Sequence, residues 1–184
     1  MSHNNDKRLF LIDAYAMIFR GYYALIRSPR ITSDGKDTSA IFGFTNSLIE
    51  LIRRERPTHL AVVFDVGEAS VRTADFSDYK ANRSETPEAI KIAIPYIHRI
   101  LEAMHVPILG VEGYEADDVI GTIACKAEKE GYTTYMVTPD KDFAQLVTDK
   151  IKIYKPGLKG AEFEILGVEE VKAKYEIDDP KQVI

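Results

Sequence analysis

The stretch Leu9-Phe10-Leu11-Ile12-Asp13, four apolar residues followed by a carboxylate, decides how the rest of this sequence is interpreted. A short apolar run without alternation is typical of a strand that is buried on both faces of a parallel sheet. The same pattern returns in Leu60-Ala61-Val62-Val63-Phe64-Asp65, and shorter apolar runs occupy residues 107–111 and 135–137. We therefore expect four central strands, of which the first two end directly in an aspartate.

Apolar residues at helical spacing lie between these runs. They predict helices over residues 14–25, 38–55, 87–105, 115–130 and 168–175. Thr86 is expected to cap the third of these helices, with Pro87 in its first turn. A hairpin is expected from residues 151–154 and 162–165, and Asp140 is expected to open a helix. Alternating strands and helices predict an α/β fold with a mostly parallel sheet and helices on both faces.

The composition is that of an ordinary globular domain, with 45% hydrophobic and 29% charged residues in 184 and a net charge of −5. No apolar run reaches the roughly 18 residues that a membrane helix needs, and the polar N-terminus lacks a signal-peptide core. The single cysteine, Cys125, leaves no partner for an internal disulfide and argues against a Cys-based zinc site. It lies in a predicted helix, where we expect it in the core.

The acidic total argues at first against a nucleic-acid partner, but the charge is unevenly distributed. Residues 1–92 carry 13 basic and 12 acidic side chains, whereas residues 93–184 carry 11 and 17. Nine of the ten arginines lie in the first half, and the planar arginine fork suits phosphate. The sequence thus predicts a basic, phosphate-facing part and a separate pool of carboxylates.

Carboxylates follow every central strand. Because the carboxyl ends of parallel strands meet at one edge of a sheet, we expect these groups to converge. Like charges packed closely raise one another's pKa unless cations neutralise them, and hard oxygen ligands suit Mg²⁺ or Mn²⁺. Two such ions can catalyse phosphodiester hydrolysis by activating water and stabilising the in-line transition state. The predicted metal ligands are Asp13, Asp65, Glu115, Asp117, Asp118, Asp140 and Asp142. Each of them alone could instead cap or favour a helix N-terminus.

A basic segment follows Asp65. Arg72, Lys80 and Arg83 lie there in a polar stretch that also holds Phe76 and Tyr79. Basic groups hold phosphates and aromatic rings stack on unpaired bases, so this segment is a candidate nucleic-acid contact. A solvated surface loop is the alternative. Arg20, which follows Asp13 on the first predicted helix, is either a phosphate clamp or an ordinary surface arginine.

Five motifs in order resemble a known family. They are Phe10-Leu11-Ile12-Asp13, Val62-Val63-Phe64-Asp65, Tyr79-Lys80-Ala81-Asn82-Arg83, Gly113-Tyr114-Glu115-Ala116-Asp117-Asp118 and Thr138-Pro139-Asp140-Lys141-Asp142. From Lys7 onward the chain resembles the N-terminal 5′-nuclease domains of bacterial DNA polymerase I, which belong to the flap endonuclease family and have a PIN-like fold. The resemblance implies a two-metal 5′–3′ exonuclease and 5′-flap endonuclease of the bacterial cytoplasm. Its expected partners are DNA with a 5′ flap, a nick or an RNA primer, and no membrane.

The resemblance also implies roles for single residues. One ion would be held by Asp13, Asp65, Glu115 and Asp117, and the second mainly by Asp140 and Asp142, with Asp118 near both. Lys80 and Arg83 resemble the catalytic basic residues of the family's arch. Arg20, Arg72 and Tyr79 would contact DNA, and Phe19 would stack on its terminal base.

The sequence departs from the family at its end. A Gly-Asp-x-x-Asp-Asn motif and a helix–hairpin–helix element are expected after residue 184. We therefore expect a polar tail over residues 1–7 and a nuclease domain over 8–184 that is a fragment of a longer, monomeric chain with a polymerase part. Its second metal site would be incomplete, so it would cleave poorly or not at all.

Three other readings stay open. A toprim-like phosphotransfer domain does not account for Asp13, Asp65 or the basic segment. A PIN-type ribonuclease is closer, although such domains are usually shorter and lack the basic insertion. A non-catalytic DNA-binding module would bind no metal and would tolerate Asp13→Ala or Asp140→Ala.

Overall fold

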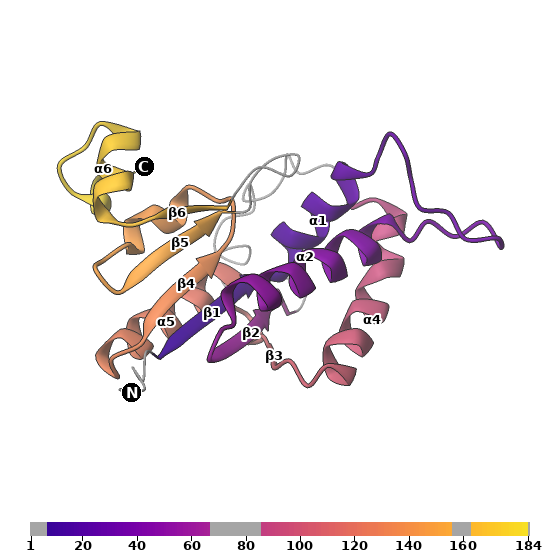
Figure 1. Ribbon diagram of the computed structural model, residues 1–184, viewed down its shortest axis with the longest axis horizontal. Coiled ribbons are helices and arrows are strands. Elements are labelled where there is room, and N and C mark those ends of the chain that lie inside the picture. Colours follow the sequence, from indigo (N-terminus) through magenta and orange to yellow (C-terminus); the bar gives the residue numbers. More distant parts are fainter. Residues whose placement is uncertain (1–6, 67–85, 156–162, 184) are drawn as a thin grey trace. The chain divides into compact units, whose positions relative to one another are not determined.

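The structure is a computed structural model that describes residues 7–66, 86–155 and 163–183 (Figure 1). It divides into two compact units, each built from separate stretches of the chain. The sheet unit comprises residues 1–13, 57–63 and 117–184, and the helical unit comprises residues 14–56 and 64–116.

The sheet unit is built on five strands in the order β2-β1-β4-β5-β6. Their bounds are β1 Arg8–Asp13, β2 His59–Val63, β4 Thr133–Val137, β5 Ile151–Lys155 and β6 Glu164–Leu166. All neighbouring strands are parallel except β5 and β6, which form an antiparallel pair. The α/β fold with a mostly parallel sheet that the sequence predicts is therefore confirmed.

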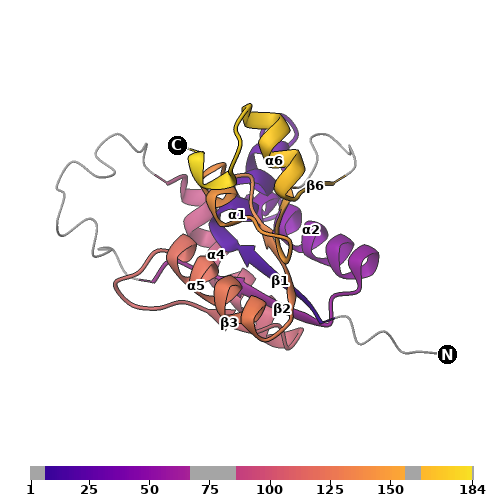
Figure 2. The ribbon, with the colours of Figure 1, turned by 90° about the vertical axis from the view of Figure 1, so that its left-hand side faces the viewer.

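Strand β1, indigo in Figures 1 and 2, lies between β2 and β4. Its residues Phe10, Leu11 and Ile12 are fully buried, and because successive side chains point to opposite faces, both faces of the strand are covered. The ring of Phe10 stacks on Tyr135 of β4, with 4.6 Å between centroids, and meets Tyr154 of β5 edge-on. The apolar run that opened the sequence is therefore a central strand.

Helices complete the sheet unit: α5 Ala116–Lys129, α6 Val168–Tyr175 and the short 3₁₀ turns η1 Asp142–Leu146 and η2 Pro180–Gln182. Cys125 is exposed, so its predicted place in the core is wrong. The buried face of α5 runs through Ile120 and Ala124, and a residue one step beyond Ala124 is rotated about 100° away.

The helical unit consists of α1 Ala14–Ala24, α2 Ser39–Glu55, α4 Glu88–Ala103 and the short strand β3 Ile108–Leu109. Helix α1 packs on α2, and α2 packs on α4. The core side chains are fully buried and recur at helical spacing; among them are Ile18, Phe44, Leu48, Ile97 and Leu101.

The contact between α1 and α2 depends on two glycines. A Cβ atom built on Gly43 would lie 2.5 Å from Cα of Gly21, and one built on Gly21 would lie 2.9 Å from the carbonyl carbon of Gly43. Real Cβ atoms do not approach backbone this closely, so both helices need a residue without a side chain at the crossing.

Several element boundaries differ from the prediction. Pro87, not Thr86, is the N-cap of α4, because its extended ψ of 140° places it outside the helix that Glu88 begins. The same helix ends at Ala103, two residues early, and His105 has a φ of 54°. Strand β3 spans only two of the five residues expected, and β6 begins at Glu164 rather than 162. Residues 156–162 of the predicted hairpin lie outside the described residues.

In the described part of the chain, no helix combines the length and apolar character that a membrane span requires.

One buried hydroxyl in the sheet unit leads to a prediction about stability. The hydroxyl of Thr134 on β4 is buried without a hydrogen-bond partner among the described residues. A buried donor left unpaired costs free energy that an apolar group of the same shape does not. We expect Thr134→Val to raise the free energy of unfolding by about 1 kcal/mol in urea titrations. Unchanged or lower stability would mean that this hydroxyl is paired in solution.

Candidate functional site

The seven predicted carboxylates are divided between the two units. Asp65 and Glu115 belong to the helical unit, and the other five belong to the sheet unit.

In the sheet unit, Thr138 joins the end of β1 to the segment after β4. Its hydroxyl donates a hydrogen bond to Oδ2 of Asp13 at 3.2 Å and accepts one from the backbone N–H of Asp140, also at 3.2 Å. This follows from the register, because β1 pairs Ile12 with Val137 and thereby brings the next residues of both strands together. Thr138 is only 1% exposed, so Asp13 and the start of the Asp140 segment are held by a buried group.

Asp140 and Asp142 follow directly. Oδ1 of Asp140 accepts a hydrogen bond from the backbone N–H of Asp142 at 3.0 Å, which forms the turn that leads into η1. The helix predicted to open at Asp140 is therefore a short 3₁₀ helix that begins at Asp142. Both carboxylates lie on exposed residues, accessible to a ligand from solvent.

Asp117 and Asp118 occupy the first turn of α5. Oδ1 of Asp117 accepts the backbone N–H of Asp118 at 2.7 Å, and both residues are half-buried. Carboxylates in a first turn also stabilise the helix through its dipole. Their position is thus compatible with both the metal role and the helix-terminus role that the sequence left open.

In the helical unit, Asp65 reaches across a wide gap in sequence. Its Oδ1 accepts a hydrogen bond from the backbone N–H of Ala116 at 2.6 Å. This contact places Asp65 beside the segment that carries Glu115, as the convergence of strand ends predicts. Glu115 is 8% exposed and is the only charged side chain among the described residues that is classed as buried. Burying a carboxylate is costly unless hydrogen bonds or opposite charge compensate it, and Glu115 has interactions within the protein.

Tyr15 is a neighbour of this acid pair that the sequence did not indicate. Burial raises the pKa of its phenol above 10.0, and the negative charge of Asp65 raises that pKa further. The ring also meets Phe64 edge-on, with 6.1 Å between centroids. Tyr15 is thus a protonated phenol next to Asp65 at neutral pH. An aromatic residue early in a helix looks like any core residue, so no sequence signal marks it.

The predicted DNA contacts on α1 have protein neighbours. Arg20 is half-buried; burial lowers the pKa of its guanidinium, and the charge of Glu50 on α2 partly opposes that effect. The ring of Phe19 stacks on Tyr23 with 6.2 Å between centroids. Base stacking by Phe19 and phosphate binding by Arg20 stay predictions. Arg72, Tyr79, Lys80 and Arg83 lie outside the described residues.

The donor chemistry fits a hard divalent cation, because every predicted ligand offers carboxylate oxygen and none is a thiol or an imidazole. Within the described residues, however, no three carboxylate, imidazole or thiol groups form a cluster that could hold one metal ion. The assembly of all seven acids into one metal centre therefore stays a prediction.

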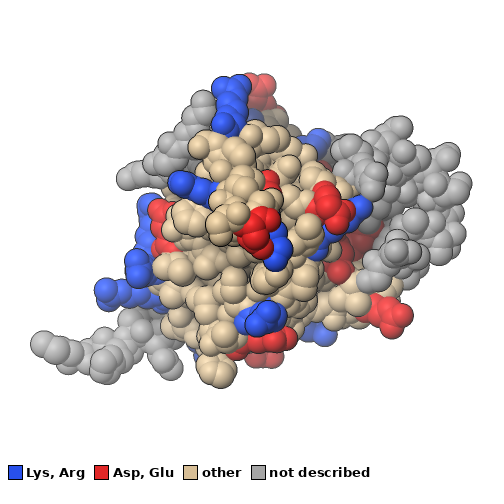
Figure 3. Space-filling view, turned by 90° about the vertical axis from the view of Figure 1, so that its right-hand side faces the viewer, with Lys and Arg blue, Asp and Glu red and all other residues tan. Residues whose placement is uncertain are grey.

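The face drawn in Figure 3 shows no large continuous area of basic or of acidic side chains on its coloured part. Basic and acidic side chains appear there as small neighbouring groups, separated by uncharged surface. Any attraction for phosphate on the coloured part of this face must come from local groups of basic residues.

Fold and site together define an α/β protein whose carboxylates follow the carboxyl ends of parallel strands. Residues 8–176 match the family model described as the 5′–3′ exonuclease, N-terminal resolvase-like domain, and the chain belongs to this family. The resemblance to the N-terminal 5′-nuclease domains of bacterial DNA polymerase I, inferred from the motifs, is confirmed.

Two curated relatives illustrate the family. DNA polymerase I of Bacillus subtilis is 38% identical over 181 residues, which are 97% of this chain and 20% of that protein. A 5′–3′ exonuclease of Aquifex aeolicus is 37% identical over 175 residues, which are 95% of this chain and 58% of that protein. The chain therefore spans about a fifth of the polymerase and just over half of the exonuclease.

Solved structures confirm the fold. The T5 D15 protein co-crystallised with metal ions has a TM-score of 0.69 at 19% identity, covering 96% of this chain and 63% of that one. The bacteriophage T5 D15 flap endonuclease, in a pseudo-enzyme-product complex with DNA and metal ions, has a TM-score of 0.67 at 18% identity, covering 96% and 63%. The PIN-like 5′-nuclease fold predicted from the motifs is confirmed.

Proposed function

We propose that this chain is a divalent-metal-dependent 5′ nuclease that hydrolyses phosphodiester bonds in DNA carrying a 5′ flap or nick. The observation that carries the proposal is the Asp13–Thr138–Asp140 linkage, which places acidic residues at adjacent strand ends in a member of the 5′–3′ exonuclease family. The metal ions and DNA bound by the T5 D15 protein support the same activity.

The proposed cations are Mg²⁺ or Mn²⁺, held by the seven strand-end carboxylates. When bound, they would lower the pKa of water and neutralise the charge that develops on the phosphate. The chain's own groups prepare this site. Thr138 orients Asp13, and the backbone amide of Ala116 orients Asp65. The phenol of Tyr15 is a proton donor in the neighbourhood of Asp65. Lys80 and Arg83 are proposed to hold the scissile phosphate.

The biological setting is proposed from the relatives. The chain would act on 5′ flaps, nicks and RNA primers in the bacterial cytoplasm, as a monomer joined to a polymerase part like that of the matched DNA polymerase I. These substrates all present a 5′ end to the same site.

A single-turnover assay tests the proposal. The 184-residue chain, in excess over a 5′-labelled flap DNA, is expected to release the flap slowly with Mn²⁺ and not at all with EDTA. A single-stranded RNA of the same sequence serves as the control substrate and should stay intact. Preferential cleavage of the RNA would instead support a PIN-type ribonuclease. DNA binding without metal binding would support a non-catalytic module.

A further inference from the structure

The short 3₁₀ helix η1 begins at one of the predicted metal ligands. It spans Asp142–Leu146, and Oδ1 of Asp140 accepts the backbone N–H of Asp142 at 3.0 Å, so the two acidic residues and η1 are joined. A five-residue 3₁₀ helix has few hydrogen bonds of its own, and their geometry is poorer than in an α-helix. The position of η1 therefore depends on the elements against which it packs.

One of these elements is α5. A Cβ atom built on Gly121 of α5 would lie 2.9 Å from Cδ1 of Leu146, so η1 and α5 are in direct contact. Gly121 follows Asp118 by less than one helical turn. A displacement of η1 along α5 would therefore change the separation between the acidic residues that the two elements carry.

Helix η1 also packs against η2, which belongs to the same sheet unit. Both elements bury apolar side chains, namely Phe143 and Ala144 in η1 and Pro180 in η2. Val183 follows η2 directly and is only 3% exposed. Apolar packing thus joins η1 to a segment that lies far from it in the sequence.

Side-chain hydrogen bonds define the shape of η2. Oε1 of Gln182 accepts the backbone N–H of Asp178 and that of Asp179, both at 3.0 Å. Oδ1 of Asp179 accepts the backbone N–H of Lys181 at 2.9 Å, which completes a capping box. These hydrogen bonds make η2 a defined turn that can hold a neighbouring element in place.

We propose that η2 is a brace for the turn of Asp140 and Asp142, and that Val183 is a positioning residue for the divalent cation these carboxylates would hold. This inference rests on the proposed function, because it concerns the same metal site. Residues that hold metal ligands in place contribute about 10–100-fold to metal affinity in other proteins. The ordinary alternative is that η2 only covers apolar surface of the sheet unit, and then it would stabilise the fold without affecting the turn.

Two measurements on Val183→Ala test the proposal. The first is hydrogen–deuterium exchange of the 184-residue chain in EDTA, which requires neither metal nor DNA. The backbone amides of residues 140–147 are expected to exchange about 10-fold faster in the variant, whereas those of β1 and β4 should not change. The second is a calorimetric titration with Mn²⁺ at a temperature at which the variant is fully folded. We expect about a 10-fold loss of affinity.

Variants of an exposed residue keep the test decisive if Val183→Ala does not fold. Gln182→Ala removes the acceptor of two hydrogen bonds and should have both effects. Gln182→Glu keeps an acceptor oxygen, and glutamate also serves in capping boxes, so residues 140–147 should keep their slow exchange.

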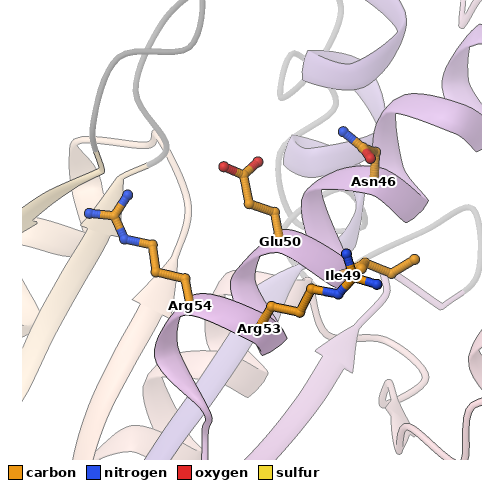
Figure 4. Close-up of a pocket in the computed structure, with 5 residues that line it drawn as sticks. All are labelled: Asn46, Ile49, Glu50, Arg53 and Arg54. Carbon is orange, nitrogen blue, oxygen red and sulfur yellow. The ribbon is translucent and has the colours of Figure 1, made fainter.

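Ile49→Ala is the control for a loss of stability alone. Ile49 is half-buried on α2, in the helical unit. It lines a hollow of about 420 Å³ together with Asn46, Glu50, Arg53 and Arg54 (Figure 4). Because the variant loses apolar packing in the other unit, it should unfold more easily without a change in Mn²⁺ affinity or in the exchange of residues 140–147.

Each outcome decides the proposal. Unchanged exchange of residues 140–147 in both Val183→Ala and Gln182→Ala would overturn the brace, and faster exchange with unchanged Mn²⁺ affinity would overturn its role at the metal site. If Ile49→Ala lowers Mn²⁺ affinity as much as Val183→Ala, the loss reflects stability alone and the proposal also fails. An unaltered chain that binds no Mn²⁺ overturns the proposed function, whereas the exchange measurement still decides whether η2 holds η1.

Discussion

An Asp13→Asn variant is expected to lose about 100-fold or more in Mn²⁺ affinity and to lose the metal-supported cleavage of flap DNA. Asparagine keeps an oxygen that can accept the hydrogen bond from Thr138, so the local fold should survive. It removes the negative charge, and a hard divalent cation prefers carboxylate oxygen. Calorimetric titration with Mn²⁺ measures the affinity without requiring turnover.

Two variants show whether this loss is specific. Asp149→Asn removes the same charge from an exposed residue of the sheet unit that is not a predicted ligand, and it should leave Mn²⁺ affinity unchanged. Thr138→Val keeps the charge of Asp13 but removes the group that orients it, so we expect about a 10-fold loss. Wild-type Mn²⁺ affinity in Asp13→Asn would contradict the metal role and leave Asp13 as a structural residue.

A Gly43→Ala variant is expected to destabilise the chain by about 3 kcal/mol or more. The added methyl would lie 2.5 Å from Cα of Gly21 and 2.8 Å from its carbonyl carbon and oxygen. Both partners of this clash are backbone, so no side chain can rotate away, and α1 and α2 must separate. Urea unfolding followed by circular dichroism measures the change in the free energy of unfolding.

The control for this variant is Asn46→Ala on the same helix. Asn46 is exposed, and alanine has the higher helix propensity, so its stability should be equal or slightly greater. Similar stability of Gly43→Ala and Asn46→Ala would show that the two helices can move apart at little cost. Gly43 would then not determine the packing of the helical unit.

The sequence predicted the fold well where its pattern is continuous. The apolar run of β1 and the spacing of α6 gave elements whose bounds agree with the structure within a residue. The predicted and observed elements agreed less well where the local preference of a residue competes with tertiary packing. Pro87 is the N-cap of α4 rather than part of its first turn, because its backbone is extended. Cys125 faces solvent because one step along a helix turns the side chain by about 100° from the buried Ala124.

The sequence predicted the acidic residues of the candidate site, but it did not predict the neighbouring residues that contact them. Asp65 and the segment of Glu115 are indeed neighbours, because strand ends converge whatever lies between them in sequence. Thr138 and Tyr15 were not predicted, because no sequence pattern distinguishes a threonine in a turn or a tyrosine in a helix as part of a site. Their roles depend on the register between β1 and β4 and on the packing around Phe64, which only a three-dimensional structure supplies.

The pairing of β1 with β4 also has a consequence for biosynthesis. Arg8 is the register partner of Thr133, so the first strand made must wait for a strand that follows 125 residues later. At about 5–20 residues per second, a ribosome needs roughly 6–25 s to supply it. During that interval the apolar edge of β1 is without its final neighbour, whereas α1 and α2 are already made and can pack locally. We therefore expect nascent chains to be more prone to aggregation before β4 is synthesised than after it.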